Sequence, residues 1–576
     1  MRDRVSCVLE IPIALVLTLL IGSSTPTRAE EPEEPLHERI DRLVEEASAG
    51  PRAALATDGE FLRRVVLDLT GTIPSAEQAR AFLDDPSPYK RQRLIDDLLA
   101  SPGYARRMQY VFDTMLMERR RDQHVPRADW ETFLYRAFAE NRPYDQLVRE
   151  ILAADGSEAP SERAPAKFVL DRGADPDLVT RDLGRIFLGR DLQCAQCHDH
   201  PLVEDYLQAH YYGLRAFLDR TSLFTEPGSG RVMLAETAEG ETTFQSVFRK
   251  SVTHSTGPRI LDGASVAEPE LPEEERYVVA PEKDVRSVPT FSRFEQLAEA
   301  LASDEVEPFA RNAANRLWAL VMKRGIYHPL DLDHSDNPPS HPELLDLLTA
   351  EFRAMDYDLK AFLRELALTR TYQRSSEPPP GSDEAASDPS RFAVALLAPL
   401  SPEQLAWSLM RGLGVVEPQE RAVEAQLDHA EAFLCEVCRD DPDRAQRRPW
   451  VVEQEVQAKL AGNVTTFVRY FGATEGQPDD AVEANVHQAL FLSNGGPVQN
   501  WVQPSGSNLT ARLQAIDDRD VLAEQLYLSL LSRRPSAQER AEVVALLEAR
   551  GADGRSAAIR DLAWALITSA EFRFNH

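Results

Sequence analysis

The chain has 576 residues, of which 94 are acidic and 64 are basic, so its formal net charge is −30. A charge of this sign is repelled by the nucleic-acid backbone and by anionic membrane surfaces, and we therefore predict no nucleic-acid partner. Five cysteines in a chain of this length are too few for a disulfide scaffold.

Residues 1–29 have the layout of a secretory signal peptide. A basic start precedes an apolar run from about Ile11 to Ile21, and Thr27-Arg28-Ala29 forms a small-x-small cleavage site. The run is shorter than the roughly 20 apolar residues that span a bilayer, so a retained anchor is the weaker alternative. We expect an exported protein of the periplasm or cell surface, with no transmembrane segment in the mature chain.

Residues 30–221 are predicted to form an N-terminal helical domain. Its apolar residues recur at helical spacing in two stretches: Phe61, Leu62, Val65, Val66 and Leu69, and then Leu178, Leu183, Ile186 and Phe187. Ser75 followed by Gln78 reads as a capping box at a helix start. We expect a helix that runs from about Asp177 and ends at the motif described next.

The motif is Cys194-Ala-Gln-Cys-His-Asp-His-Pro201, which contains the Cys-x-x-Cys-His signature of covalent haem attachment. In such a site Cys194 and Cys197 each bond one vinyl group of haem c, and His198 is the axial iron ligand. His200 is too close in sequence to reach the opposite face of a haem. The candidates for a sixth ligand are His210, Met233 and His334.

Two other interpretations of this motif stay open. Cys194 and Cys197 with His198 or His200 and with His210 provide a tetrahedral zinc set, and a four-thiolate zinc site would add Cys435 and Cys438. Alternatively, each Cys-x-x-Cys pair is a local disulfide, and the histidines are hydrogen-bonded in a tight turn before Pro201.

The amino-acid composition changes in residues 222–290, where a mixture of β-branched, polar and glycine residues precedes an acidic, proline-rich stretch. This composition predicts a β-containing insert of short strands or hairpins followed by a linker.

Residues 291–576 return to helical periodicity and should form a C-terminal helical domain. Leu344, Leu345, Leu348 and Phe352 define one helix there, and Ser340 to Glu343 and Ser536 to Glu539 read as capping boxes. The fold class is therefore mainly α.

One phrase occurs three times, as LLASPGYAR from Leu98, LALTRTYQR from Leu366 and LITSAEFRF from Leu566. In each copy a Ser or Thr stands three residues before an aromatic residue. This spacing is typical of a helix end whose next turn is fixed by a buried ring. The irregular period indicates a reused helix-turn-helix unit rather than a solenoid.

Two polar clusters follow in the C-terminal half. Asp331, Asp333, Ser335 and Asp336 resemble the start of a calcium loop, but Asp336 stands where that loop needs glycine, so a structural role is expected. One helical face carries four polar residues, Arg311, Asn312, Asn315 and Arg316. These side chains could bind an anionic or sugar ligand, or they could form a hydrogen-bonded network between helices. No nucleophile elbow, phosphate-binding loop or His-Glu-x-x-His motif is present, and the sequence leaves open whether the protein is an enzyme.

The phrases FLRRVVLDLTGTIPSAEQARAFLDD, LGRDLQCAQCHDHP and YYGLRAFL resemble a planctomycete secreted, cytochrome-like domain of unknown function. PFARNAANRLWALVMKRGIYHPLDLDHSDNPPSHPELLDLL and ALFLSNGGPVQ resemble its C-terminal partner domain, also of unknown function. The resemblance implies a secreted, two-domain architecture and a haem at Cys194, Cys197 and His198. Cys435 and Cys438 are not part of the family pattern.

The function predicted from the sequence is that of a secreted c-type cytochrome-like protein, which transfers electrons to an unknown redox or surface partner through haem. The alternative is a non-haem surface scaffold or binding protein that uses its cysteine pairs as disulfides or zinc ligands.

Overall fold

A computed structural model describes residues 34–47, 50–159, 162–379, 388–431, 442–477 and 485–576. The predicted signal peptide, Cys435 and Cys438 lie outside the described residues. None of the helices in these ranges is long and apolar enough to cross a membrane.

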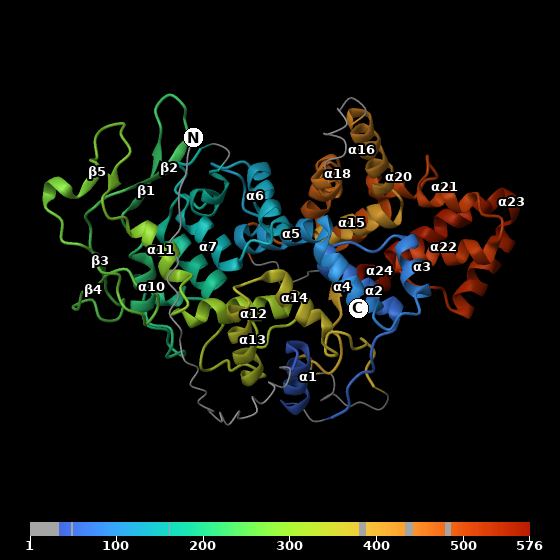
Figure 1. The fold of residues 1–576 in the computed structure, drawn as a ribbon, viewed down its shortest axis with the longest axis horizontal. Helices are drawn as coiled ribbons and strands as arrows, with labels where there is room; N and C mark the ends of the chain where they lie inside the picture. Colours follow the sequence, from blue (N-terminus) through green and yellow to red (C-terminus); the bar gives the residue numbers. More distant parts are fainter. Residues whose placement is uncertain (1–33, 48–49, 160–161, 380–387, 432–441, 478–484) are drawn as a thin grey trace, which may run out of the picture.

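The fold is mainly α-helical, as predicted, and a small β-containing region, which interrupts the helices in the sequence, lies at one end of the molecule (Figure 1). The helices before that region are α1 (Leu36–Ala47), α2 (Asp58–Thr70), α3 (Ala76–Asp84), α4 (Lys90–Ala100), α5 (Pro102–Met117), α6 (Arg127–Ala139), α7 (Tyr144–Ala153), α8 (Lys167–Leu170), α9 (Pro176–Asp182) and α10 (Gln208–Arg215). The predicted apolar stripe of α2 is buried along its whole length.

The β-containing region consists of three antiparallel two-stranded sheets, which confirms the predicted short strands. They pair β1 (Thr221–Thr225) with β2 (Val232–Glu236), β3 (Thr242–Phe244) with β4 (His254–Thr256), and β5 (Tyr277–Val279) with β6 (Val288–Pro289). A fourth sheet, which the sequence pattern does not predict, pairs β7 (Ala398–Pro399) with β8 (Phe574–Asn575).

The helices that follow the insert continue to residue 573. They are α11 (Arg293–Leu301), α12 (Glu307–Met322), α13 (Pro342–Ala354), α14 (Leu359–Leu368), α15 (Pro402–Gly412), α16 (Val416–Glu431), α18 (Pro442–Phe471), α19 (Val486–Asn494), α20 (Gly496–Val502), α21 (Leu509–Gln514), α22 (Arg519–Leu531), α23 (Ala537–Thr568) and α24 (Ala570–Arg573). The apolar residues that predicted α13 are all buried.

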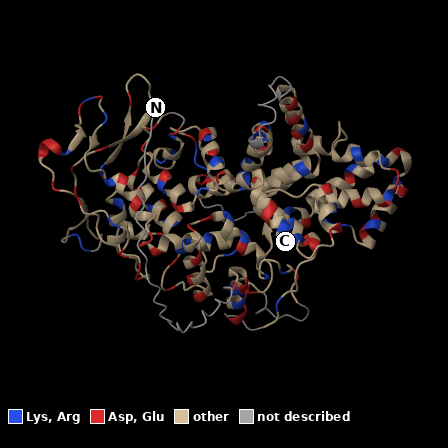
Figure 2. Cartoon of the chain, viewed as in Figure 1, with Lys and Arg blue, Asp and Glu red and all other residues tan. Residues whose placement is uncertain are grey.

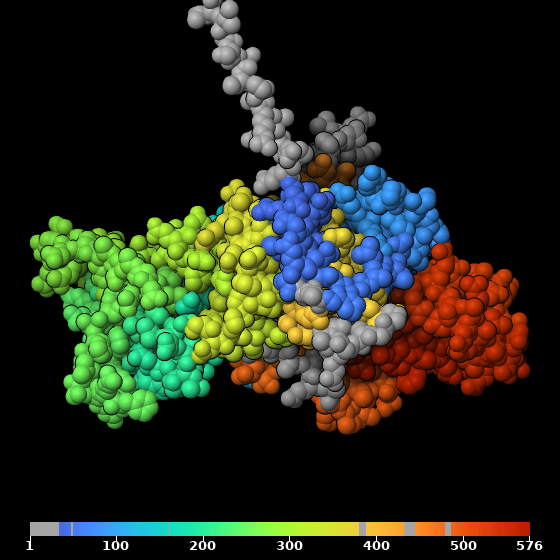
Figure 3. Space-filling view, turned by 90° about the horizontal axis from the view of Figure 1, so that it is seen from below, coloured from blue at the N-terminus to red at the C-terminus, as the bar shows by residue number. Residues whose placement is uncertain are grey.

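Two hydrophobic cores hold these helices together. The larger core joins residues from α1 to α14 with the insert, so helices from before and after the insert pack on one another. The second core is formed mainly by residues after Leu400, and α2 contributes to both, since Leu67 packs into the second core and its neighbours into the first. The insert and the helices after residue 500 form opposite ends of an elongated molecule (Figures 1 and 3).

Two buried arginines make α2 the central helix of the fold. Arg63 donates to the carbonyl oxygens of Leu530 (3.1 Å) and Phe572 (2.7 Å). Arg64 donates to the carbonyl oxygens of Tyr372 and Arg374, both at 2.7 Å. Because a buried guanidinium is costly unless its donors are satisfied, these bonds fix α2 against three distant segments.

The threefold phrase has the structure that its spacing predicted. In each copy the hydroxyl donates at 2.7 Å to the carbonyl oxygen three residues earlier, closing the helix end: Ser101 to Leu98, Thr369 to Leu366 and Ser569 to Leu566. The aromatic residue three positions later is at most 3% exposed in every case. Two of the carbonyl oxygens bound by α2 belong to these aromatic residues.

The capping boxes at Ser75 and Ser536 are confirmed, but the one at Ser340 is wrong. Pro342 occupies the first position of α13, which moves the cap to His341. The amide and hydroxyl of Ser340 instead both donate to the carbonyl oxygen of Ile326, at 2.8 and 3.0 Å.

Candidate functional site

The cysteine motif lies in a loop rather than at the end of a helix, which corrects the expected helix. Helix α9 continues as a π-helical turn that ends at Phe187, and Gly189 then adopts the left-handed conformation (φ 68°) and turns the chain away. Arg190 pairs with Leu332 in an isolated bridge, and the amide of Asp191 donates to the carbonyl oxygen of Asp331 at 2.8 Å. The motif is therefore anchored to the loop that follows α12.

Cys194 and Cys197 bracket a single 3-10 turn, Cys194–Gln196. The amide of Cys197 donates to the carbonyl oxygen of Cys194 at 3.2 Å, and Ala195 between them is fully buried. Burial of Ala195 directs the flanking positions outward, and both cysteines are exposed free thiols. The turn thus presents both cysteine side chains at the surface as free thiols.

His198 follows directly and has one ring nitrogen bound. Its Nδ1 lies 2.6 Å from the carbonyl oxygen of Asp199, which can only accept, so Nδ1 carries the proton and Nε2 has the free lone pair. Metal-ligating histidines commonly use one nitrogen in this way, which orients the ring and leaves the other nitrogen for the metal. The ring centroid lies 5.0 Å from that of Phe248.

Exposed apolar side chains surround the turn. Phe248 is 77% exposed and Leu202 is 79% exposed, and Val247 and Val252 in the same insert loop are about half exposed. The amide of Val247 donates to the carbonyl oxygen of Cys197 at 3.0 Å, which fixes this loop against the motif. Single exposed apolar side chains are common, whereas several of them close together are typical of ligand and partner sites.

The other predicted ligands are engaged elsewhere. His200 Nδ1 accepts the amides of Leu202 (3.3 Å) and Val203 (2.9 Å), and His210 Nε2 lies 2.8 Å from Asp262 Oδ1. The structure therefore does not bring His200 and His210 together with the thiols. Nowhere in the described ranges do three or more His, Cys, Asp or Glu side chains form a group that could hold a metal ion.

The remaining candidates for a sixth ligand differ in their surroundings. Met233 is buried on β2. His334 packs edge-on against Tyr206 at 5.4 Å, and Tyr206 packs against His200 at 5.9 Å, so Tyr206 separates His334 from the motif. Burial raises the pKa of Tyr206, and its hydroxyl donates to the carbonyl oxygen of Asp333 at 3.3 Å.

The two polar clusters of the C-terminal half form a network between helices, as expected. Asn312 donates to the carbonyl oxygen of Ile186 at 2.8 Å, and Asn315 Oδ1 accepts the amides of Ile326 (2.7 Å) and Tyr327 (3.3 Å). These bonds satisfy backbone groups that would otherwise be buried without partners.

Two of the three aspartates of the calcium-like loop, Asp331 and Asp333, bind arginines. Asp331 is ion-paired with Arg316 and, at 3.3 Å, with Arg185, and Asp333 is ion-paired with Arg311 at 3.4 Å. Their charges are thereby compensated within the protein.

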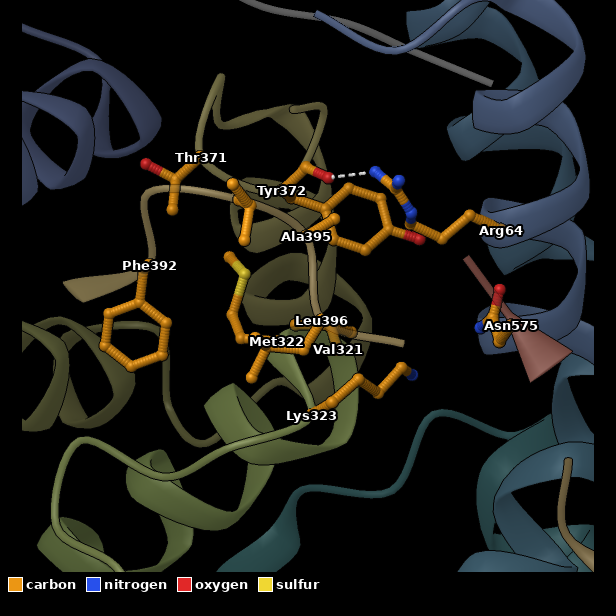
Figure 4. Close-up of a pocket in the computed structure, with 11 residues that line it drawn as sticks. Arg64, Val321, Met322, Lys323, Thr371, Tyr372, Phe392, Ala395, Leu396 and Asn575 are labelled. Atoms are coloured by element: carbon orange, nitrogen blue, oxygen red, sulfur yellow. Dashed lines mark hydrogen bonds between the residues drawn. The ribbon is translucent and has the colours of Figure 1, made fainter. Parts of the chain in front are cut away.

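A buried cluster around Asp68 was not anticipated from the sequence. The carboxylate is ion-paired with Lys323 and accepts bonds from the Tyr372 hydroxyl (2.9 Å) and the Asn575 amide (2.7 Å). Figure 4 shows Lys323 extending toward Asn575, with Tyr372 and Arg64 above. Burial lowers the pKa of Lys323 although Asp68 opposes this effect. The sequence signal that could have indicated this buried cluster is the presence of an aspartate and two arginines within the apolar phrase FLRRVVLDL.

Two family models match the chain. PSCyt2, a protein of unknown function (DUF1549), matches residues 38–222, and PSD1, a protein of unknown function (DUF1553), matches residues 293–547. The β-containing insert lies between the two matches. No curated protein and no solved structure matches the chain. The chain thus belongs to a paired-domain family of unknown function in which a PSCyt2 domain precedes a PSD1 domain.

Proposed function

We propose that the PSCyt2 domain binds one haem covalently through Cys194 and Cys197, and that the protein is an exported c-type cytochrome-like electron carrier. The single observation that carries the proposal is the turn itself. It presents two exposed free thiols and an adjacent imidazole whose Nε2 is available as a ligand.

The residues present fit the chemistry of haem attachment. Two thiols on one short turn match two vinyl groups, and the carbonyl oxygen of Asp199 holds the His198 ring in the tautomer that a metal requires. The exposed side chains of Leu202 and Phe248 provide apolar cover beside the thiols. A haem bound there would supply a one-electron redox centre close to the surface, within reach of a partner protein.

Neither His210 nor His334 is placed as a sixth ligand, because His210 is bound to Asp262 and Tyr206 separates His334 from the turn. We therefore propose that the second axial position is open or is filled from outside the described residues.

The test is to produce the chain, including its N-terminal segment, in a bacterial host that matures c-type cytochromes. Intact mass and the reduced visible spectrum are then recorded. We expect the mass of one covalent haem and a c-type absorption band, both lost in Cys194→Ser/Cys197→Ser. The matched control is Cys435→Ser/Cys438→Ser, which removes a cysteine pair of identical spacing that is not followed by histidine. This control variant should retain the haem. A colourless product without added mass would overturn the proposal.

His198→Met tests the axial ligand separately from the covalent attachment, because it leaves both thioether bonds intact. The added mass should remain while the spectrum changes to that of an altered axial ligand. Metal analysis and thiol titration of the same samples detect the alternative, in which zinc or a disulfide occupies the cysteines of a non-haem scaffold.

A further inference from the structure

A cavity of about 480 Å³ lies between the two family domains. Its walls come from α5 and the turn at Arg185 on one side, and from α12, the loop after it and the segment around Leu400 on the other. Phe471 at the end of α18 and Gln488 on α19 complete the lining. The volume is within the range of small-molecule sites, which also tend to lie at domain interfaces.

Most of the wall is apolar. It is formed by residues from several elements: Val111, Phe112, Met115, Ile186, Leu317, Leu320, Leu330 and Leu400. A ligand with a hydrocarbon or aromatic body would be desolvated there.

The charged residues of the wall are mostly basic, although the chain carries a net charge of −30. Among the described residues that line the cavity, Arg107, Arg185, Arg316, Lys323 and Arg324 face two carboxylates, those of Glu118 and Asp331. Elsewhere acidic and basic side chains are interspersed along the helices (Figure 2), so this excess does not belong to a wider basic face.

Three of the five cations are neutralised within the protein. Arg185 is paired with Glu118 at 2.5 Å and with Asp331, Arg316 is paired with Asp331, and Lys323 is paired with Asp68. The excess positive charge therefore resides on Arg107 and Arg324.

Arg107 is the exceptional residue. It is only 8% exposed, and no side chain or carbonyl in the described part of the chain forms a hydrogen bond or ion pair with its guanidinium. The carboxylates that influence it, Asp68 and Glu403, are already engaged, Asp68 by Lys323 and Glu403 by Arg119 at 2.7 Å. A buried charge without a partner is strongly unfavourable, and burial accordingly lowers the pKa of Arg107.

Two further polar side chains, those of Arg324 and Tyr144, line the cavity. Arg324 Nε has no acceptor among the described residues, and Tyr144 lines the same cavity. Arg107 and Arg324 supply donors only, and the Tyr144 hydroxyl can donate as well, which is the arrangement that an anionic group completes.

We propose that this cavity binds a small amphipathic organic anion, whose anionic group pairs with Arg107 while its apolar body packs against α5 and α12. The ligand would contact both family domains at once and hold them together. The proposal does not depend on haem, because the cysteine turn contributes no residue to the cavity.

Binding is tested on the full chain with anilinonaphthalene sulfonate, an aromatic anion whose fluorescence rises in apolar sites. We expect one saturable site per chain, displaced by decanoate and much more weakly by decanol, which has the same body without the charge. Arg107→Gln should weaken binding about tenfold or more, because a charge-assisted contact is lost. The matched control is Arg311→Gln, which removes a partly buried arginine that does not line this cavity, and should leave the affinity unchanged.

Leu320→Trp tests the cavity independently, since it fills the apolar wall and keeps Arg107. It should also abolish binding, and thermal melting of each variant checks that the fold is retained. Equal affinity for decanoate and decanol, unchanged binding in Arg107→Gln, or unchanged binding in Leu320→Trp would each overturn the proposal. Loss of haem in the cysteine variants would leave this binding intact, so the two proposals fail separately.

Discussion

Replacing Asp68 with asparagine should destabilise the fold far more than a typical substitution. Its side chain is fully buried and holds Lys323, Tyr372 and Asn575, which come from three distant segments. Asparagine has nearly the same shape but no charge, and its single carbonyl oxygen cannot accept from all three donors. The ammonium group of Lys323 would be left without a counter-charge.

The expected cost follows from the burial of the pair. Removing one partner of a fully buried ion pair costs about 3–5 kcal/mol. Because the Lys323 side chain retains 16% of its exposure, we expect a value near the lower limit, about 3 kcal/mol. Asp68→Asn/Lys323→Met removes both charges and should cost less than the sum of the single changes, with a coupling of about 2 kcal/mol.

Urea unfolding followed by both far-ultraviolet circular dichroism and tryptophan fluorescence gives these free energies. The matched control is Asp85→Asn, which breaks the exposed ion pair with Arg93 (2.6 Å) and should cost less than about 1 kcal/mol. If Asp68→Asn is as mild as the control, or if the double variant is strictly additive, the cluster does not act as a buried charge pair.

Three other changes have defined outcomes. Arg533 holds the pKa of Glu539 down at about 2, below its ordinary value of 4.5. The stability that this ion pair contributes is therefore complete above pH 5 and is lost as the pH falls toward 2. Glu539→Gln should reduce this acid-induced loss of stability by about 1 kcal/mol, and an unchanged slope of the pH–stability curve would contradict the role of the ion pair. Gly189→Ala should cost about 2 kcal/mol or more, since φ is 68° and a Cβ atom would lie 2.6 Å from the Tyr327 hydroxyl; a melting temperature equal to the parent's would refute this strain. Asn315→Ala leaves two buried amides without an acceptor and should cost about 2–3 kcal/mol in urea unfolding, whereas a cost below 0.5 kcal/mol would mean that water replaces the side chain.

Local features of the fold could be predicted from the sequence because nearby residues determine them. The apolar stripe of α2, the capping box at Ser75 and the hydroxyl-closed helix ends depend on side chains within four positions of one another. The β-containing insert followed from composition in the same way. Ser340 was the exception, since the proline two residues later moved the start of the helix.

Features that depend on distant segments could not be predicted in this way. Arg106 and Arg107 are neighbours in one helix, yet Arg106 is paired with Glu453, while Arg107 faces a cavity with no partner in the described residues. The sequence shows only two adjacent arginines, and their different roles are decided by segments some 300 positions away. The cysteine turn was found from its spacing, but its exposure and its apolar surroundings depend on the packing of the insert.

The contacts of α2 have a consequence for the time at which the protein can fold. Arg63 binds the carbonyl oxygen of Phe572, which is synthesised 509 residues later. At a synthesis rate of about 5–20 residues per second, α2 waits for roughly 25–100 s before this partner exists. During that interval its buried arginines and both of its apolar faces lack their native contacts. A PSCyt2 domain produced without the later segments should therefore be unstable, and the nascent chain is expected to rely on a chaperone that shields α2 until synthesis is nearly complete.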